Sequence, residues 1–321
     1  IRHGATVIAI GADVYEPTEY LYKKSDKVFT HLELGERIAQ GDEAVVGADN
    51  LVMIQCVGCR NEDRNYCSRV CCSHAIKNAL KLKERRPGMN IYVLFRDMRT
   101  YGLKEDYYRE AADKGVAFIR YTPETKPEVQ EAKEEGKDVL KVTVFDPVLG
   151  KNIELNADVL SLASAVVPSA STDEVAGLFK VNLSPDRFFK EAHVKLRPVE
   201  FAADGVYLCG TAHYPKHIEE TINQAYGAAG RVLTLLTHDT VVASGSVCEV
   251  VERDCVSCGA CITACSYGAI EFRETENGKK AWVNPVLCKG DGVCNAKCPT
   301  HAVVLKHFTD EEILSQIDAA I

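Results

Sequence analysis

Short runs of apolar residues alternate with amphipathic segments over most of the chain. The run 51–55 is almost entirely apolar, as expected of a parallel strand covered on both faces. Residues 73–86 have helical spacing and stop before a proline. This alternation predicts a doubly wound α/β domain. Strands are expected at 5–12, 51–55, 91–95, 116–121, 158–167 and 206–210, and helices at 28–41, 73–86, 107–114 and 218–237.

Two segments interrupt this alternation. Residues 139–145 and 151–155 flank a turn and predict a β-hairpin, which the charged stretch 131–137 precedes. A glycine-containing join at 243–246 leads into a cysteine-rich end, whose cysteine motif is repeated. The chain is therefore expected to continue into a separate small domain.

Length and charge limit the classes of function. The 321 residues suffice for two or three domains, and a net charge of −8 without a basic tract argues against a nucleic-acid partner. A membrane helix needs about 20 apolar residues, and Arg231, His238 and Asp239 interrupt the longest candidate. We therefore expect a soluble, cytoplasmic protein with no membrane span and no bound nucleic acid.

Fourteen cysteines point to metal ligands. Most of them cluster at ligand spacings within a long acidic chain, which thiolate ligation in a reducing, anaerobic cytoplasm explains better than disulfides. Cys209 and Cys248 stand apart from these groups, and we interpret them as buried packing residues.

The cysteines between residues 255 and 299 have the spacing of a ferredoxin with two iron–sulfur clusters. In that spacing three thiolates of one loop bind one cluster and the fourth crosses to the other. Zinc is the alternative, but it rarely needs seven cysteines in this crossed arrangement. The predicted ligands are Cys255, Cys258, Cys261 and Cys298 for one cluster, and Cys265, Cys288 and Cys294 for most of the other.

Asp291 departs from this pattern, because it stands where a fourth cysteine of the second cluster belongs. A carboxylate is a harder ligand than a thiolate. Asp291 could ligate the fourth iron, or it could leave a 3Fe-4S cluster or an exchangeable iron. Alternatively it is a surface residue between Gly290 and Gly292, and another group supplies the ligand.

A second group of cysteines lies between the predicted strand 51–55 and the helix 73–86. In a dinucleotide-binding domain this crossover carries a glycine-rich loop for the pyrophosphate. Here metal ligands take the place of that loop. Structural zinc, or a redox dithiol made of the first two cysteines, is the alternative. The five are Cys56, Cys59, Cys67, Cys71 and Cys72, one more than a cluster needs.

Residues 205–212, with the helix that follows, resemble the closing FAD segment of flavoproteins with two dinucleotide-binding domains. In those proteins a strand ends at glycine beside the cofactor, and the next helix begins at the flavin, where its dipole stabilises the reduced anion. An ordinary strand–glycine–helix unit is the alternative. Residues 6–12 and 158–163 resemble the strands that leave and re-enter the FAD domain. The predicted FAD contacts are Gly11, Gly210, Thr211, Ala212, Pro215, Lys216 and Ile218.

All these features, in this order, resemble the A subunit of heterodisulfide reductase. The resemblance covers nearly the whole chain and implies a thioredoxin-reductase-like body with an embedded Fe–S site, followed by an α+β ferredoxin-like domain. It implies that Cys56, Cys67, Cys71 and Cys72 bind the embedded cluster, with Cys59 as an extra thiol. It also places Lys77 near flavin N5. The alternative for Lys77 is a solvated residue of an amphipathic helix.

The resemblance also divides the chain into domains. Because the chain opens at Ile1 inside a predicted strand, we expect the family's first FAD motif to precede it. The expected parts are the end of an FAD segment (1–16), a degenerate nucleotide-type α/β domain with the Fe–S site (17–160), a returning FAD segment (161–243), a ferredoxin domain (244–308) and a C-terminal helix (309–321).

The function that the resemblance implies is electron transfer in a soluble anaerobic complex. FAD and three 4Fe-4S clusters would split or relay electrons between a two-electron donor, ferredoxin and a disulfide-type acceptor. The alternatives for the cluster near Asp291 are a 3Fe-4S cluster and ligation by Asp291. The implied partners are a hydrogenase- or formate-dehydrogenase-type donor module, B- and C-like subunits of the reductase, ferredoxin, and a second copy of the chain. The alternatives are an NAD(P)H-dependent flavoprotein of the glutamate-synthase small-subunit type and a non-catalytic polyferredoxin.

Overall fold

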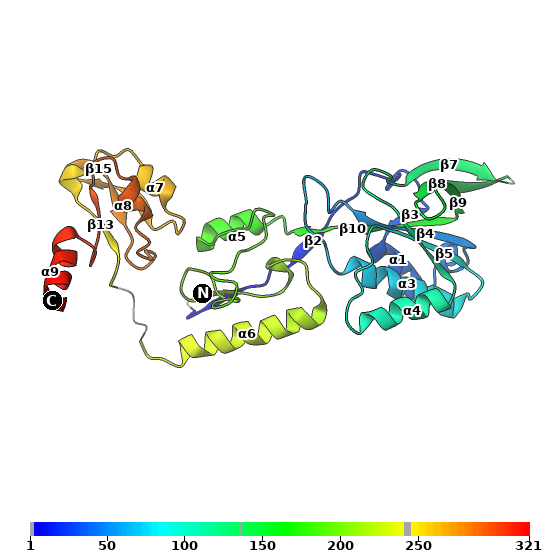
Figure 1. The fold of residues 1–321 in the computed structure, drawn as a ribbon, viewed down its shortest axis with the longest axis horizontal. Helices are drawn as coiled ribbons and strands as arrows, with labels where there is room; N and C mark the ends of the chain where they lie inside the picture. Colours follow the sequence, from blue (N-terminus) through cyan, green and yellow to red (C-terminus); the bar gives the residue numbers. More distant parts are fainter. Residues whose placement is uncertain (1–2, 135, 241–244) are drawn as a thin grey trace. The chain divides into compact units, whose positions relative to one another are not determined.

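Two units make up the computed structural model, which describes residues 3–134, 136–240 and 245–321 (Figure 1). The α/β unit consists of Ala12–Pro168 and Pro215–Ile218. The terminal unit consists of Ile1–Gly11, Ser169–Tyr214 and Glu219–Ile321.

A parallel sheet in the order β3-β10-β4-β5-β6 forms the centre of the α/β unit (Figure 1). Its middle strand β4, Asn50–Val57, is buried along nearly its whole length, because its apolar side chains meet neighbours on both faces. The other strands are β3 (Val28–Thr30), β10 (Val159–Ser164), β5 (Asn90–Phe95) and β6 (Val116–Arg120).

Helices cover one face of this sheet (Figure 1). Leu51 and Met53 of β4 are fully buried there, in one core with Leu34 and Ile76 of two helices. Each such side chain stabilises the fold by about 1.5–3 kcal/mol relative to an exposed one. The helices are α1 (His31–Gln40), α2 (Glu43–Val46), α3 (Cys71–Arg85) and α4 (Lys104–Asp113).

A three-stranded antiparallel sheet, β7-β8-β9, covers the opposite face. Val52 and Ile54, which alternate with the helix-facing residues of β4, are buried in one core with Leu140 and Val142 of β8. The predicted hairpin is confirmed as β8 (Lys137–Asp146) and β9 (Lys151–Ala157). The charged stretch before it is the edge strand β7, Glu128–Glu134, whose side chains remain largely exposed.

The first helix begins later than its predicted start at residue 28, because Val28–Thr30 pair with β10 as strand β3. Thr30 then caps α1: its hydroxyl accepts from the Glu33 backbone N–H, and the Glu33 carboxylate accepts from the Thr30 N–H at 2.6 Å. Such a capping box fixes a helix start and is readable in sequence as T-x-x-E. A short antiparallel pair, β2 (Ala12–Val14) with β11 (Val166–Pro168), completes the strands of the α/β unit.

The terminal unit begins with two strands that are distant in sequence. Strand β1, Thr6–Ile8, pairs in parallel with β12, Val206–Leu208. Ile8 and Leu208 are buried in one core with Phe189 and Phe201, whose rings meet edge to face at 5.8 Å. The helical elements of this part are α5 (Thr172–Phe179), the 3-10 turn η1 (Gly210–Ala212) and α6 (Ile218–Leu236).

The cysteine-rich end folds around two antiparallel strand pairs, β13–β16 and β14–β15. Cysteines contribute much of its small core, together with Ile270, Val283 and Val303. The elements are β13 (Cys248–Val250), η2 (Glu252–Asp254), α7 (Ala260–Ala264), β14 (Ile270–Thr275), β15 (Gly278–Val283), α8 (Val293–Lys297), β16 (Val303–Leu305) and α9 (Asp310–Ala320). The predicted combination of an α/β body and an α+β cysteine-rich end is confirmed.

Candidate cluster and flavin sites

A small cavity in the cysteine-rich end is lined by all four cysteines predicted to bind its first cluster. Helix α7 presents one of them, Cys261, which is buried, whereas Cys258 in the preceding loop is exposed. Burial raises the pKa of the Cys261 thiol, so a metal that binds there displaces a proton. The chemistry and placement of the donors fit a cluster. The four are Cys255, Cys258, Cys261 and Cys298.

The second predicted cluster has its three cysteines in the same core. Cys294 is buried on α8, and burial raises the pKa of its thiol, a shift to which the nearby Cys265 and Cys288 sulfurs contribute. The Cys265 sulfur also accepts a hydrogen bond from the Ala269 backbone N–H at 3.4 Å. The structure therefore brings these three predicted ligands together.

Cys248 joins this group, although its sequence position predicted only a packing role. Its thiol contacts the Cys294 sulfur at 3.4 Å, and its backbone N–H donates to the Cys288 sulfur, also at 3.4 Å. The side chain is buried, as predicted. Its neighbours, however, are thiols that the motif assigns to a cluster.

Asp291 lies at the surface. One oxygen of its carboxylate accepts a hydrogen bond from the backbone N–H of Val293, the first residue of α8, at 3.3 Å. The carboxylate of Asp291 therefore contacts the first backbone N–H of a short helix in this structure. Burial, followed by the nearby Asp291 carboxylate, raises the pKa of Tyr267.

The second cysteine group lies where β4 ends and α3 begins, as predicted. Cys56 has a left-handed backbone, with φ of 63°, at the point where the β4–β10 register shifts. Such a bulge re-aims a side chain and is typical of functional sites. Cys71 and Cys72 form the first turn of α3, and both are buried.

Hydrogen bonds pair four of these five thiols. Cys56 bonds to Cys59 and lowers the pKa of Cys59 to about 6. Cys71 bonds to Cys72 and lowers the pKa of Cys72 to about 7. The sulfur of the fifth, Cys67, accepts from the Arg69 backbone N–H at 3.3 Å. Cys59, which the resemblance treats as an extra thiol, thus lies inside the group.

Positive charge adjoins these thiols. Arg60 approaches the Cys56 sulfur at 3.8 Å and is held by an ion pair with Asp97 at 2.6 Å. The hydrogen bond from Arg60 lowers the pKa of the Asp97 carboxyl. A neighbouring guanidinium favours the thiolate form that metals bind. Cys56 and Cys59 also line a cavity of about 490 Å³, with Arg60, Arg96 and Lys126 among its other residues.

Lys77 lies on α3, beyond the two buried cysteines of that helix. The residue is exposed, but partial burial of its ammonium lowers the pKa of Lys77. A Cβ on Gly35 of α1 would lie 3.4 Å from the Lys77 ammonium and 3.4 Å from the His74 ring, so the ammonium sits beside α1. Lys77 is therefore not a fully solvated lysine, and its place beside flavin N5 stays a prediction.

The predicted flavin contacts belong to both units. Gly11 and Gly210 follow the paired strands β1 and β12, and the Gly210 N–H donates to Gln224 at 3.0 Å. A Cβ added to Gly11 would meet only the Thr211 hydroxyl, at 3.8 Å, so room for a ligand exists there. Gly11, Gly210, Thr211 and Ala212 lie in the terminal unit, whereas Pro215, Lys216 and Ile218 lie in the α/β unit.

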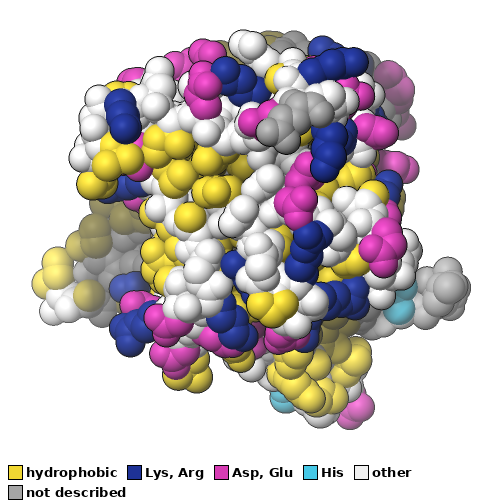
Figure 2. All heavy atoms as spheres, turned by 90° about the vertical axis from the view of Figure 1, so that its right-hand side faces the viewer, with side chains coloured by type: hydrophobic (Ala, Val, Ile, Leu, Met, Phe, Trp, Pro, Cys, Tyr) yellow, Lys and Arg dark blue, Asp and Glu magenta, His cyan; other side chains and the backbone are white. Residues whose placement is uncertain are grey.

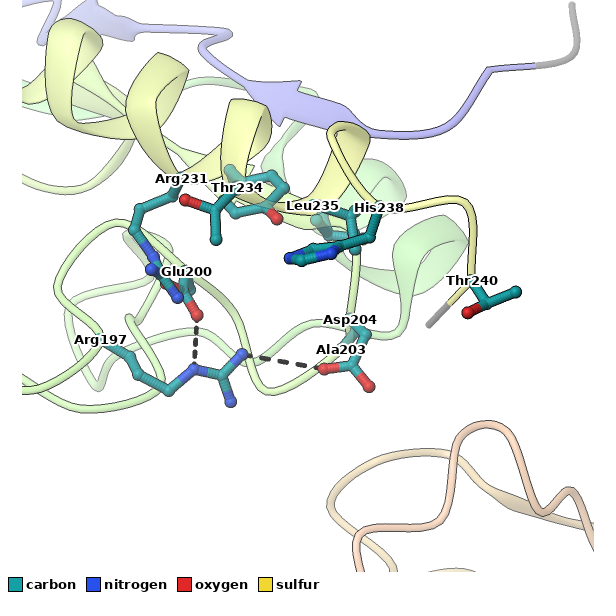
Figure 3. Close-up of a pocket in the computed structure, with 12 residues that line it drawn as sticks. Arg197, Glu200, Ala203, Asp204, Arg231, Thr234, Leu235, His238 and Thr240 are labelled. Carbon is teal, nitrogen blue, oxygen red and sulfur yellow. Dashed lines mark hydrogen bonds and ion pairs between the residues drawn. The ribbon is translucent and has the colours of Figure 1, made fainter. Parts of the chain in front are cut away.

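A cavity of about 390 Å³ opens beside β12 and α6 of the terminal unit (Figure 3). Glu200 lines this cavity and pairs with Arg197 at 2.6 Å and with Arg231. Partial burial raises the pKa of Glu200, but these hydrogen bonds outweigh it and lower the pKa overall. Asp204 also pairs with Arg197, at 3.8 Å, so two carboxylates oppose the two guanidiniums and the cavity is not a strong anion site.

Surface features of the described residues add little to these sites. Lys and Arg side chains alternate with Asp and Glu over the face shown in Figure 2. Within residues 3–134, 136–240 and 245–321, no three His, Cys, Asp or Glu side chains surround one point closely enough to hold a single metal ion. No helix of the described chain has both the length and the apolarity to cross a membrane.

Comparison with known proteins identifies relatives of both parts. Residues 254–302 match the 4Fe-4S dicluster domain family. The chain is 36% identical over 337 residues to the iron–sulfur A subunit of the CoB–CoM heterodisulfide reductase of Methanocaldococcus jannaschii, covering 100% of this chain and 50% of that protein. It is 38% identical over 334 residues to an iron–sulfur A subunit of the same reductase from Methanopyrus kandleri, covering 99% of this chain and 50% of that protein.

Solved structures with a similar arrangement include the thioredoxin reductase of T. acidophilum, at 13% identity and a TM-score of 0.47, covering 73% of this chain and 66% of that one. The chain spans about half the length of the curated relatives it matches. Its identity to them nevertheless extends from end to end of the chain. Over its whole length the chain is therefore similar to part of the iron–sulfur A subunits of heterodisulfide reductase.

Proposed function

We propose that this chain is the electron-transferring part of an iron–sulfur flavoprotein oxidoreductase. The observation that carries the proposal is the cavity lined by Cys255, Cys258, Cys261 and Cys298, within a segment that matches a dicluster family. Bound clusters would carry single electrons, and FAD would exchange electron pairs with a two-electron donor.

The proposal includes three 4Fe-4S clusters. Two belong to the cysteine-rich end, and the third belongs to the group at β4 and α3. For the third we keep the ligand set that the family resemblance implies, Cys56, Cys67, Cys71 and Cys72. The bulge at Cys56 and the burial of Cys71 and Cys72 support it. Arg60 would stabilise the negative charge of the ligated thiolates.

The flavin would lie at the ends of β1 and β12. Gly11 leaves room for it, and a hydrogen bond to Gln224 fixes the backbone of Gly210. His213 supports this loop, since its ring bonds to Glu191 at 2.9 Å and to Gln224 at 2.8 Å. Lys77 would be the lysine beside flavin N5, where an ammonium favours reduced flavin.

The partners in this proposal follow the names of relatives. One of these, from Methanococcus maripaludis, is the A subunit of an H(2)/formate:CoB-CoM heterodisulfide,ferredoxin reductase. We therefore propose a hydrogenase- or formate-dehydrogenase-type donor module, ferredoxin, and a disulfide acceptor on B- and C-like subunits. The chain would either split electron pairs between the two acceptors or relay single electrons between them.

An anaerobic reductive titration tests this function. The protein that carries this chain is titrated with reduced ferredoxin, and separately with NADH, while flavin absorbance and cluster EPR are recorded. We expect ferredoxin to reduce the clusters and the flavin, and NADH alone to reduce neither. Direct reduction of the flavin by NADH would favour an enzyme of the glutamate-synthase small-subunit type instead.

A further inference from the structure

The second cluster of the cysteine-rich end has three cysteines in its motif, and Asp291 occupies the fourth position. A four-iron cluster needs one ligand for each iron, and thiolates are the ligands that such clusters use. The Asp291 carboxylate lies at the surface and bonds to the N–H of Val293 instead. The carboxylate is thus engaged with the backbone at the start of α8 in this structure.

Cys248 lies beside the thiols of this motif. Only 4% of the residue is exposed, and its thiol lies 3.4 Å from the Cys294 sulfur. Its backbone N–H donates to the sulfur of Cys288. Two of the three motif cysteines of this cluster are therefore direct neighbours of Cys248.

The strand that carries Cys248 is fixed by pairing across the small domain. Strand β13 pairs with β16 so that Cys248 lies opposite Leu305. A further bond from the Lys306 N–H to the Val247 carbonyl, at 3.1 Å, holds the residue before it. The position of the thiol is thus set by regular strand pairing.

We propose that Cys248 supplies the fourth thiolate of the cluster bound by Cys265, Cys288 and Cys294. This inference rests on the proposed function, since it assumes a cluster at that motif. Ligation forms an iron–sulfur bond and releases the thiol proton to solvent, with no change of oxidation state. Ligands of different irons lie farther apart than the two sulfurs here, so the Cys248 side chain turns about its Cα–Cβ bond on binding.

Cys248 lies seven residues before Cys255 and outside the matched segment 254–302, which is why spacing did not reveal it. The consequence is that Asp291 does not determine the type of the second cluster. Both clusters of the domain then have four irons and only cysteine ligands.

The test compares Cys248→Ala with Asp291→Ala in the anaerobically purified chain. EPR distinguishes the clusters, because an oxidised three-iron cluster is paramagnetic and an oxidised four-iron cluster is not. We expect Cys248→Ala to produce the three-iron signal and to lose about one iron per chain. Asp291→Ala should retain the iron content and spectrum of the unaltered protein. Cys209→Ala, which removes a buried cysteine from another core, is the matched control.

Further outcomes distinguish a loss of ligation from a folding defect and from failure of the proposed function. If Cys248→Ala matches the unaltered protein and Asp291→Ala gives the three-iron signal, Asp291 is the ligand and the inference is wrong. The backbone N–H to Cys288 remains in Cys248→Ala, so a mere N–H donor role predicts no loss of iron. If Cys248→Ala misfolds, Cys248→Ser should keep the first cluster and change only the second. Absence of both clusters from the unaltered protein would refute the proposed function instead.

Discussion

Substitution of Gly290 tests the structure of the loop between Cys288 and Cys294, which carries two predicted ligands of the second cluster. The backbone of Gly290 has φ of 66°, and a Cβ added there would overlap the backbone carbonyl oxygen of Ser246. Gly292 has a similar φ of 72°, but the nearest atom to an added Cβ is the end of the Leu305 side chain, at 3.5 Å. The two substitutions therefore share the backbone strain and differ in the clash.

The magnitudes follow from these contacts. A left-handed backbone costs a residue with a Cβ about 1–2 kcal/mol, which is the whole expected loss for Gly292→Ala. Gly290→Ala adds the displacement of a backbone segment, which raises the expected loss to about 2–5 kcal/mol. The displaced segment leads directly into Cys248. Gly290→Ala should therefore also empty the second cluster selectively.

Urea unfolding followed by fluorescence measures both effects. Trp282, the only tryptophan of the chain, lies on β15 within the cysteine-rich end and reports on that segment. Iron content of the same samples reports cluster occupancy. Equal unfolding midpoints for Gly290→Ala and Gly292→Ala, with full iron in both, would refute the contact between the loop and the segment before β13.

Three further predictions concern the other sites. Cys67→Ser should remove about four irons, whereas Cys59→Ser should keep them, as iron analysis would show. Lys77→Gln should shift the flavin reduction potential, measured by redox titration, because it removes an ammonium; Lys81→Gln, one turn further along α3 and paired with Glu84, should not. The folded pKa of Glu200 is below its ordinary value of 4.5, so its contribution to stability is present above that pH and is lost as the pH falls through the folded pKa. Glu200→Gln should therefore flatten the pH dependence of urea midpoints followed by circular dichroism.

Each of these predictions has an opposing result. Iron lost from Cys59→Ser and kept by Cys67→Ser would assign the ligand to Cys59, which the hydrogen-bonded group already contains. Equal potentials for the Lys77 and Lys81 variants would show that Lys77 does not act on the flavin. An unchanged acid dependence in Glu200→Gln would show that other carboxyl groups dominate.

The elements that sequence predicted well are those determined by local pattern. The run 51–55 became the buried strand β4, because apolar side chains on both faces leave few alternatives. The T-x-x-E box at Thr30 could have placed the start of α1 correctly. Strand β7 was missed because it is an exposed edge strand, in which neither face needs apolar residues.

The sequence predicted candidate sites where the spacing of cysteines groups the ligands within one loop. The cysteines of the first cluster line one cavity as the motif required. Cys248 could not be predicted, because only the pairing of β13 with β16 brings it to Cys294. The position of Cys59 within the embedded group likewise depends on a tertiary feature, the bulge at Cys56. Cysteine spacing in the sequence predicts ligands that lie in one loop. A ligand on a separate strand, such as we propose for Cys248, can be predicted only when the strand pairing is known.

Iron and acid-labile sulfide per chain, measured with Mössbauer spectra on the anaerobically purified protein, test the central claim most directly. The account predicts about 12 iron and 12 sulfide, all in four-iron clusters. About 11 iron with a three-iron component would contradict the ligation by Cys248. About 8 iron together with stoichiometric zinc would contradict the embedded cluster at Cys56 and Cys71, and with it the proposed path of electrons through the α/β unit.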